Sequence, residues 1–157
     1  MEELAYLVTG GAGFLGSNIA AALLRTKRPV VVLDNLSRIG SGDNLAWLRT
    51  LGDFEFLHVD TRNSYDVVNA VKGRHLKAVF HLAGQVAMTT SLQSPRKDFE
   101  VNVLGSLNVL EAIRELSPET AVVYASSNKV YGDLAHLPLG ELEVEDIEVL
   151  GHPLRPN

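Results

Sequence analysis

The chain has 157 residues, of which 46% are hydrophobic and 21% charged, and these values fit one globular domain of ordinary size. The net charge of −5, with lysine and arginine scattered along the chain, argues against nucleic acid and anionic membranes as partners. The absence of cysteine excludes disulfide bonds and thiolate metal sites, and we expect no metal centre. The acidic start is unlike a secretory signal and no segment is apolar for the length of a bilayer, so we expect a cytoplasmic protein.

Short apolar runs, rich in β-branched residues, alternate with segments of helical spacing. We predict strands at residues 4–8, 30–33, 54–59, 78–82 and 121–125. We predict helices at residues 14–27, 64–71 and 99–116. The strands are apolar throughout, as is typical of parallel strands buried on both faces.

This alternation predicts βαβ units, and therefore an α/β fold with a doubly wound parallel sheet, the Rossmann fold. We expect the strand order 3-2-1-4-5, which places a ligand crevice at the carboxyl ends of the first and fourth strands. The pattern supports one such domain over residues 1–133. Residues 134–157 are rich in acidic residues and proline, and we expect an irregular tail there.

Three glycines, Gly10, Gly13 and Gly16, follow the first strand and open the first helix. We expect Gly10 to permit the tight turn, Gly13 to let a pyrophosphate approach the backbone, and Gly16 to let the helix pack closely against the sheet. The helix N-terminus would then meet the phosphates with free N–H groups. The alternative is an ordinary turn between strand and helix.

Asp34 ends the second strand, about twenty residues beyond this loop, where an acidic residue binds the ribose hydroxyls of a dinucleotide. A carboxylate there repels the 2′-phosphate of NADP, so we expect NAD, a preference that Arg38 would partly soften. The alternative is that Asp34 is a cap or turn residue.

Two further residues end predicted strands. Asp60 could accept a hydrogen bond from the adenine amino group, or it could be the N-cap of the following helix. We interpret His81 as a packed strand histidine rather than as an acid or base, and the small residues that follow it would let the backbone lie against the cofactor.

Several segments together resemble the extended short-chain dehydrogenase/reductases that rework nucleotide sugars. Besides the glycine loop, they are residues 34–38, 60–62, 81–84, 101–103, 105–112, 122–127 and 130–132. Residues 43–48, 84–91 and 126–133 resemble more narrowly the CDP-paratose 2-epimerases, also called CDP-tyvelose epimerases.

The resemblance implies tightly held NAD and a transient oxidation of a nucleotide sugar. In such epimerases a tyrosine phenolate removes a hydroxyl proton, while hydride passes to and from the nicotinamide at the same carbon. For the paratose enzymes that carbon is C2, and the substrate is CDP-linked. Ser127 falls on the serine/threonine position that relays the proton, and Asn128 and Lys129 would border the substrate pocket. The alternatives are that Ser127 only caps the strand end and that Lys129 is a solvated surface charge.

The loop and the resemblance together place sixteen residues at the NAD cofactor. They are Gly10, Gly13, Phe14, Leu15, Gly16, Asp34, Asn35, Ser37, Arg38, Asp60, Thr61, Leu82, Ala83, Gly84, Gln85 and Asn102.

The family's Tyr-x-x-x-Lys pair does not occur here, because no tyrosine of the chain is followed four residues later by lysine. In the family this pair lies further along, as do a sixth strand and a C-terminal sugar-binding domain. We therefore expect a chain truncated before these parts, which binds NAD but has no epimerase turnover by itself. The family also implies a homodimer, formed through helices that include residues 99–116 and the helix before it. The alternative cause of self-association is apolar surface exposed by the truncation.

Two other functions remain open. One is a non-catalytic NAD-binding module. The other is a fragment of a nucleotide-sugar dehydratase, although dehydratases usually carry an acidic pair where Asn128 and Lys129 stand.

Overall fold

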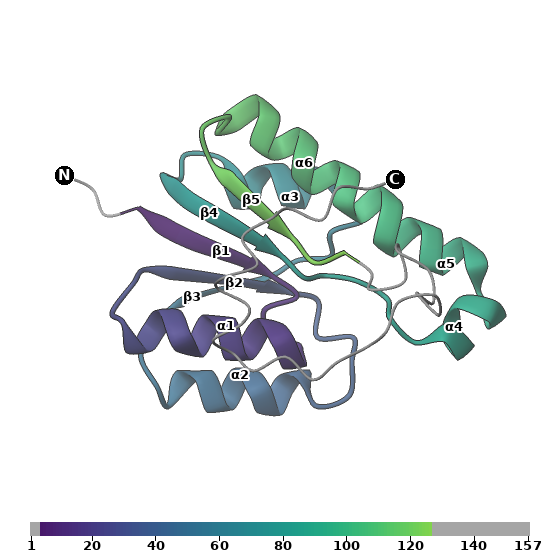
Figure 1. Ribbon diagram of the computed structural model, residues 1–157, viewed down its shortest axis with the longest axis horizontal. Helices are drawn as coiled ribbons and strands as arrows, with labels where there is room; N and C mark the ends of the chain where they lie inside the picture. The colour runs from purple at the N-terminus through teal and green to yellow at the C-terminus, as the bar shows by residue number, and fades with distance from the viewer. Residues whose placement is uncertain (1–3, 127–157) are drawn as a thin grey trace, which may run out of the picture. The chain divides into compact units, whose positions relative to one another are not determined.

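The structure, a computed structural model, describes residues 4–126. Within these residues, five parallel strands form one sheet (Figure 1). The strands are β1 (Ala5–Thr9), β2 (Val30–Asp34), β3 (Glu55–His58), β4 (Leu76–His81) and β5 (Ala121–Tyr124). Their order is β3-β2-β1-β4-β5, and every neighbouring pair is parallel. The predicted fold class and strand order are confirmed. The chain divides into two compact units, Met1–Ala125 and Ser126–Asn157, and of the second only Ser126 is described.

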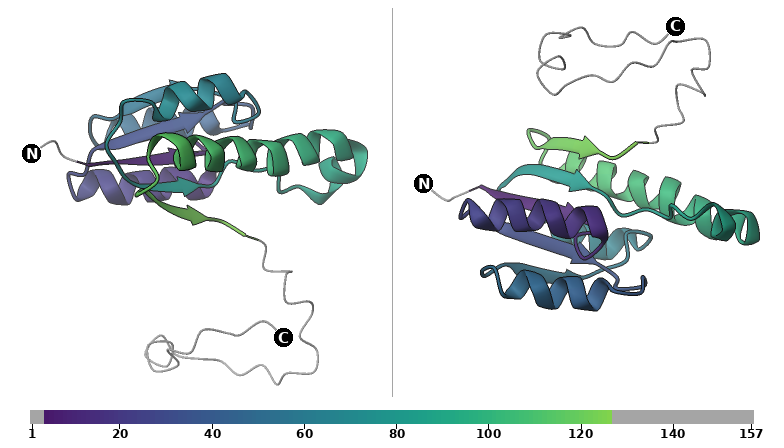
Figure 2. Two further views of the ribbon diagram at one scale, coloured as in Figure 1. Left: turned by 90° about the horizontal axis from the view of Figure 1, so that it is seen from above. Right: turned by 60° about the horizontal axis from the view of Figure 1, so that its bottom comes forward.

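Helices cover both faces of the sheet (Figure 2). On one face, α1 (Phe14–Arg25) and α2 (Ser41–Arg49) pack over side chains such as Val8 and Val32. On the other face, α3 (Ser64–Val71) and α6 (Gly105–Leu116) pack over side chains such as Leu7. Alternate residues of β1 thus enter two separate cores, which explains why the strand is apolar throughout.

The edge strands depart from the prediction that all five strands are buried. No residue of β3 or β5 is fully buried, and Val123 and Tyr124 are 48% and 51% exposed. Each of these strands has a single neighbour among the described residues. An apolar run predicts a strand but not the number of strands that flank it, and so the expectation was wrong at the edges.

Four segments that the sequence did not predict as separate elements lie between the expected ones: α2, α4 (Met88–Gln93), α5 (Pro95–Phe99) and the π-helical turn η1 (Glu100–Leu104). The predicted helix over residues 99–116 is therefore the last residue of α5, the π-helical turn and α6. Gly105 begins α6 against Thr61, and a Cβ there would lie 2.7 Å from the Thr61 hydroxyl. The glycine thus lets α6 approach the end of β3.

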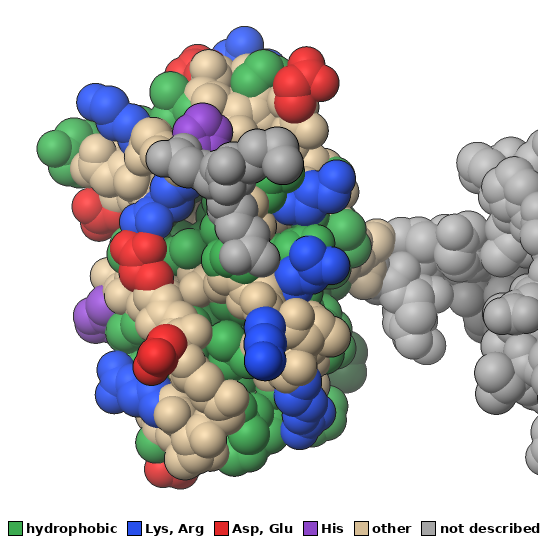
Figure 3. Space-filling model, turned by 90° about the vertical axis from the view of Figure 1, so that its left-hand side faces the viewer, with side chains coloured by type: hydrophobic (Ala, Val, Ile, Leu, Met, Phe, Trp, Pro, Cys, Tyr) green, Lys and Arg blue, Asp and Glu red, His purple; other side chains and the backbone are tan. Residues whose placement is uncertain are grey.

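The amino-terminal ends of the strands form the face shown in Figure 3, where lysine and arginine side chains lie among acidic and hydrophobic ones. Arg25 lies in the last turn of α1, and Lys27 and Arg28 follow it. Positive charge at this end of a helix interacts favourably with its dipole. The candidate site lies at the opposite, carboxyl ends of the strands.

Candidate functional site

A tight glycine turn joins β1 to α1. Gly10 has φ +67°, and a Cβ on it would lie 2.7 Å from the Ala83 backbone nitrogen. Both the conformation and the space therefore require glycine. The turn lies directly against the segment that follows β4, at the point where the crevice was predicted.

Gly16 lies in the first turn of α1, and its close neighbour is the loop itself rather than a strand. A Cβ on Gly16 would clash with the Gly10 carbonyl oxygen and would lie 2.7 Å from the Gly11 Cα. Gly11, which was not among the predicted site residues, is equally constrained, because a Cβ there would lie 2.8 Å from both the Val8 carbonyl oxygen and a Val32 methyl group. A Cβ on Gly13 would approach only the Gly10 oxygen, at 3.1 Å.

The N-terminus of α1 is open. Gly13 is its N-cap, no side chain caps it, and its first turn carries no acidic residue. Phe14 is 85% exposed and Leu15 is also exposed. An uncapped helix N-terminus presents free N–H groups and a partial positive charge, and it suits an anion such as a phosphate.

Asp34 connects this loop to the end of β2. Its side chain is buried, with Oδ2 accepting a hydrogen bond from the Ala12 N–H at 3.0 Å and Oδ1 accepting one from the Leu36 N–H at 2.8 Å. The second contact makes Asp34 a turn residue, as the alternative proposed. A carboxylate offers about four acceptor positions, so the two contacts leave acceptor capacity for ribose hydroxyls beside the glycine loop.

The residues after Asp34 form a loop ordered by their own side chains. Asn35 accepts a hydrogen bond from the Ser37 N–H and donates one to Asp60 Oδ2, at 3.1 and 3.0 Å. Its carbonyl oxygen lies 3.0 Å from His58 Nε2. Arg38 follows and is exposed. Asn35 thus links the ends of β2 and β3.

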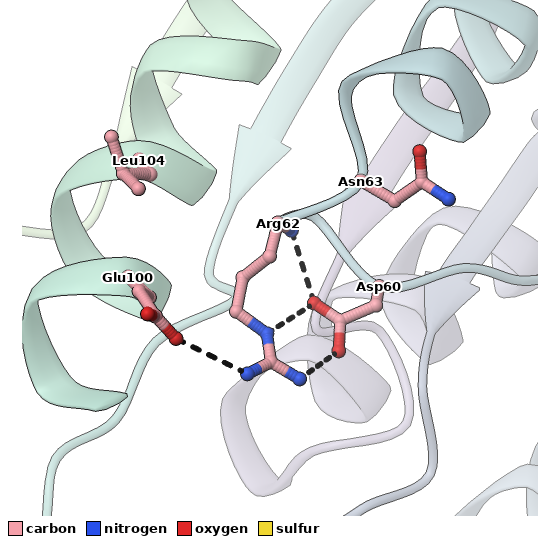
Figure 4. Close-up of a pocket in the computed structure, with 5 residues that line it drawn as sticks. All are labelled: Asp60, Arg62, Asn63, Glu100 and Leu104. Carbon is pink, nitrogen blue, oxygen red and sulfur yellow. Dashed lines mark hydrogen bonds and ion pairs between the residues drawn. The ribbon is translucent and has the colours of Figure 1, made fainter. Parts of the chain in front are cut away.

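Asp60 is held by Arg62 in an exposed pocket of about 380 Å³, which Asn63, Glu100 and Leu104 also line (Figure 4). The Arg62 guanidinium donates from Nε to Oδ1 at 3.0 Å and from Nη2 to Oδ2 at 2.7 Å. These hydrogen bonds hold the pKa of the Asp60 carboxyl well below its usual range, against the opposing effect of partial burial. Asp60 is therefore ionised and can only accept hydrogen bonds.

Asp60 is not the N-cap of the following helix, and that alternative was wrong. Asn63 caps α3, with its side-chain oxygen accepting from the N–H groups of Tyr65 and Asp66 at 3.1 and 3.4 Å. Asparagine is as good a cap as aspartate, so residue type alone did not decide between the two positions. Thr61, between them, is buried.

The segment after β4 is fixed from two sides. The Thr9 hydroxyl accepts hydrogen bonds from the N–H groups of Leu82 and Ala83, both at 3.3 Å. The Asn102 side chain accepts from the Gln85 N–H at 2.8 Å and donates to the Gln85 carbonyl at 3.0 Å. Asn102 therefore holds this segment in place, and a Cβ added to Gly84 would lie 3.3 Å from its amide oxygen.

His81 is a packed strand histidine, as predicted, and it lies at the centre of a buried hydrogen-bonded chain. Its Nδ1 lies 2.7 Å from the Thr9 hydroxyl and its Nε2 lies 2.9 Å from the Ser106 hydroxyl. Ser106 donates its one proton to the Asn102 carbonyl at 2.6 Å. Nε2 must therefore carry the proton, and Nδ1 accepts from Thr9. Burial lowers the pKa of His81 to about 4.

Ser127 and residues 128–133 lie outside the described residues, as does the predicted tail of residues 134–157. The other sixteen predicted residues all lie in segments that meet at the carboxyl ends of β1–β4. No helix within residues 4–126 has the length and apolar character to cross a bilayer.

A doubly wound parallel sheet with a glycine turn at the crevice between β1 and β4 defines a Rossmann fold. The sequence model of the GDP-mannose 4,6 dehydratase family matches residues 7–148, and the chain belongs to this family.

Individual relatives are epimerases. The chain is 52% identical over 137 residues to the CDP-paratose 2-epimerase of Salmonella typhi, a match that covers 87% of this chain and 40% of the relative. A solved UDP-glucose 4-epimerase from Stenotrophomonas maltophila, with bound NAD and formylated UDP-arabinopyranose, is 26% identical with a TM-score of 0.76, over 87% of this chain and 41% of that one. The UDP-glucose 4-epimerase of Thermus thermophilus, in complex with NAD, is 41% identical with a TM-score of 0.61. This match covers 71% of this chain and 34% of that one. The chain thus spans less than half the length of these relatives.

Proposed function

We propose that the chain is the cofactor-binding part of an NAD-dependent nucleotide-sugar epimerase, specifically a CDP-paratose 2-epimerase of the cytoplasm. The observation that carries this proposal is the 52% identity to a CDP-paratose 2-epimerase over 87% of the chain. The UDP-glucose 4-epimerases that also match share lower identity, such as 33% for a putative one from Methanocaldococcus jannaschii. Residues 1–133 form the NAD-binding domain in this proposal.

The residues present fit NAD. The glycine turn leaves no room for side chains, and the uncapped N-terminus of α1 beside it suits a pyrophosphate. Asp34, which accepts from the Ala12 N–H at 3.0 Å and has acceptor capacity to spare, suits the adenosine ribose. Asn35, Ser37 and Arg38 would border this ribose.

The remaining predicted contacts lie on the other strands. Thr61 and the ion pair of Asp60 with Arg62 would line the adenine end of the cofactor site. The segment of residues 82–85, which Asn102 holds in place, would support the rest of the cofactor.

Bound NAD would supply reversible hydride transfer at a sugar carbon. The chain's own residues bind and orient it: α1 neutralises phosphate charge, Asp34 fixes the ribose, and Thr9 and Asn102 hold the segment after β4 against the crevice. We propose that Ser127 orients the sugar hydroxyl. Proton removal needs a base that a serine hydroxyl, with its high pKa, does not provide.

The activity can be tested directly. A protein that joins this sequence to the remaining part that the relatives have is expected to convert CDP-paratose to CDP-tyvelose, monitored by chromatography of the nucleotide sugars. The polypeptide of residues 1–157 alone is expected to bind NAD without turnover. Conversion of UDP-glucose but not of CDP-paratose would contradict the proposed substrate.

Asp34→Ala is expected to weaken NAD binding by about 10- to 100-fold, because hydrogen bonds to a charged group contribute about 1.5–3 kcal/mol. Calorimetric titration of the variant with NAD and NADP measures this. The preference for NAD over NADP should also shrink, since the repelling carboxylate is gone. Asp53→Asn, at the amino-terminal face, is the control and should leave both affinities unchanged. Equal NAD affinity in Asp34→Ala and the parent chain would show that Asp34 does not contact NAD.

We further propose that the chain forms a homodimer through an apolar stripe that runs from the last residue of α5 through η1 and along α6. Phe99, Val103, Leu107 and Leu110 recur at helical spacing, and all four are exposed. A stripe of this kind on two copies can pack against itself about a two-fold axis.

Leu107→Glu is expected to weaken dimerisation by at least about tenfold, because burying an unpaired carboxylate costs more than about 1.4 kcal/mol. Sedimentation equilibrium across a range of protein concentrations measures the dissociation constant. Leu116→Glu, on the same helix but off the stripe, should dimerise like the parent chain. A parent chain that stays monomeric at high concentration would overturn the proposed dimer.

A further inference from the structure

Ala12, in the middle of the glycine turn, is held through both of its backbone polar groups by side chains from other elements. Its N–H donates to Asp34 Oδ2 at 3.0 Å, and its carbonyl oxygen accepts from Asn44 Nδ2 at 2.9 Å. Asp34 ends β2, and Asn44 lies on α2, which packs beside α1 on the same face of the sheet (Figure 1). The first contact belongs to the site already described, whereas the second has no role in it.

Asn44 belongs to residues 43–48, the segment that resembles the CDP-paratose 2-epimerases. Its neighbours in α2, Leu45 and Leu48, are buried and attach the helix to the core. Asn44 itself is half-buried, and its side-chain amide crosses to a backbone carbonyl of the glycine turn. This contact joins α2 to the shape of the turn rather than to the apolar core.

The peptide between Ala12 and Gly13 needs support from outside, because glycine permits a wide range of backbone conformations. Gly13 has φ −73° and ψ 175° and is the N-cap of α1. The N–H of this peptide donates to the Gly10 carbonyl oxygen at 3.0 Å, and its carbonyl oxygen accepts from Asn44. Asn44 thus supplies one of the two hydrogen bonds that fix the orientation of the peptide.

The orientation of this peptide determines how α1 begins. The Ser17 N–H donates to the Gly13 carbonyl oxygen at 2.9 Å, which is the first turn of regular helical bonding. The N–H groups of Phe14, Leu15 and Gly16 precede it, and N–H groups at these helix positions have no intrahelical acceptor. Their direction follows from the backbone at Gly13, so a contact that fixes this backbone also aims these three N–H groups.

Loss of the Asn44 amide would remove the hydrogen bond that satisfies the carbonyl oxygen of Ala12, a residue that is fully buried. Rotation of the peptide toward water would relieve this. The rotation would also break the hydrogen bond between Gly13 and Gly10 and turn the N–H groups at the start of α1. The hydrogen bond from the Ala12 N–H to Asp34 belongs to the preceding peptide and would persist.

We propose that Asn44 is a positioning residue for the pyrophosphate of the dinucleotide, because its amide fixes the peptide that aims the first N–H groups of α1. The proposal rests on the proposed function as an NAD-binding site and adds a residue to it. Hydrogen bonds weaken when donor and acceptor are poorly aligned, so a turned helix start binds phosphate less tightly. Asn44 does not touch the cofactor and acts through the turn alone.

The test compares NAD with adenosine, which has the base and the ribose but no phosphate. Asn44→Leu keeps the approximate size of the side chain without the donor, and it should lower NAD affinity by about tenfold, equivalent to one hydrogen bond. Adenosine affinity should change by less than about threefold, because Asp34 keeps its place. Calorimetric titration measures NAD binding, and NMR titration measures the weaker adenosine binding. Asn44→Gln, which retains an amide donor on a longer side chain, should recover part of the NAD affinity.

Thr50→Val is the matched control, because the Thr50 hydroxyl donates to the Trp47 carbonyl oxygen at 2.7 Å at the other end of α2. It should bind both ligands like the parent chain. Unchanged NAD affinity in Asn44→Leu, equal losses for NAD and adenosine, or no recovery in Asn44→Gln would each overturn the positioning role. If Asn44→Leu does not fold, Asn44→Ala, with the strongest helix former, is judged by the same criteria. Failure of the parent chain to bind NAD would instead overturn the proposed function itself.

Discussion

Gly16→Ala is expected to abolish measurable NAD binding and to lower the free energy of unfolding by about 1–3 kcal/mol, the usual cost of overpacking. The added methyl group would clash with the Gly10 carbonyl oxygen and would press on the Gly11 Cα at 2.7 Å. Both neighbours are backbone atoms of the glycine turn between β1 and α1, so the turn must move to admit the methyl group. Urea denaturation and calorimetric titration with NAD measure the two effects.

Gly42→Ala is the matched control for this substitution. Gly42 lies within α2 and an added Cβ would meet nothing within 4 Å. Alanine there should stabilise the chain by up to about 1 kcal/mol through helix propensity, with NAD binding unchanged. If Gly16→Ala were as stable and bound NAD as tightly as Gly42→Ala, the turn would be far more adaptable than its contacts indicate.

Acidification from pH 7 to pH 4 is expected to lower the free energy of unfolding by about 3 kcal/mol through His81 alone. Burial lowers its folded-state pKa to about 4, while the unfolded value is 6.5. Between these two values the unfolded chain binds a proton that the folded chain does not, so stability falls as the pH falls. Protonation at Nδ1 would also oppose the Thr9 hydroxyl, whose acceptor positions are used by Leu82 and Ala83.

His81→Gln separates this effect from the general acid sensitivity of the carboxylates. Glutamine also offers an acceptor and a donor but does not titrate in this range. The variant should be less stable than the parent chain at pH 7, by about 1–3 kcal/mol for imperfect buried hydrogen bonds, and the difference should narrow toward pH 4. His58→Gln, on the exposed edge strand β3, should change stability by less than about 0.5 kcal/mol. A constant difference between parent and His81→Gln at every pH would exclude the buried neutral imidazole.

The sequence predicted the elements whose signals are local and strong. The five strands and α1, α3 and the body of α6 follow from apolar runs and periodicity. The α2 helix was missed because its buried apolar side chains are only Leu45 and Leu48. The α4 helix, with the sequence MTTSLQ, buries no residue at all, so no periodic signal exists there.

The candidate site was predictable where the backbone dictates residue type. Gly10 needs glycine for its positive φ, and Asp34 lies at a fixed spacing from it. Contacts between distant segments were not predictable. The pairing of Asn102 with Gln85 depends on η1 lying beside the end of β4, and that of Arg62 with Asp60 depends on a side-chain conformation. For the same reason the sequence suggested Asp60 as a free acceptor.

The central position of β1 has a consequence for how the chain acquires its site during synthesis. β1 pairs with β2, about 25 residues later, but also with β4, more than 70 residues later, and the Gly10 turn is completed by contact with Ala83. Closing such a long loop is entropically costly and slow compared with local pairing. The first three strands can therefore assemble on a ribosome before the Gly10 turn has its final support from the segment after β4. Nucleotide binding would then begin only once β4 has paired with β1. A ligand present during translation would stabilise the chain only after that step.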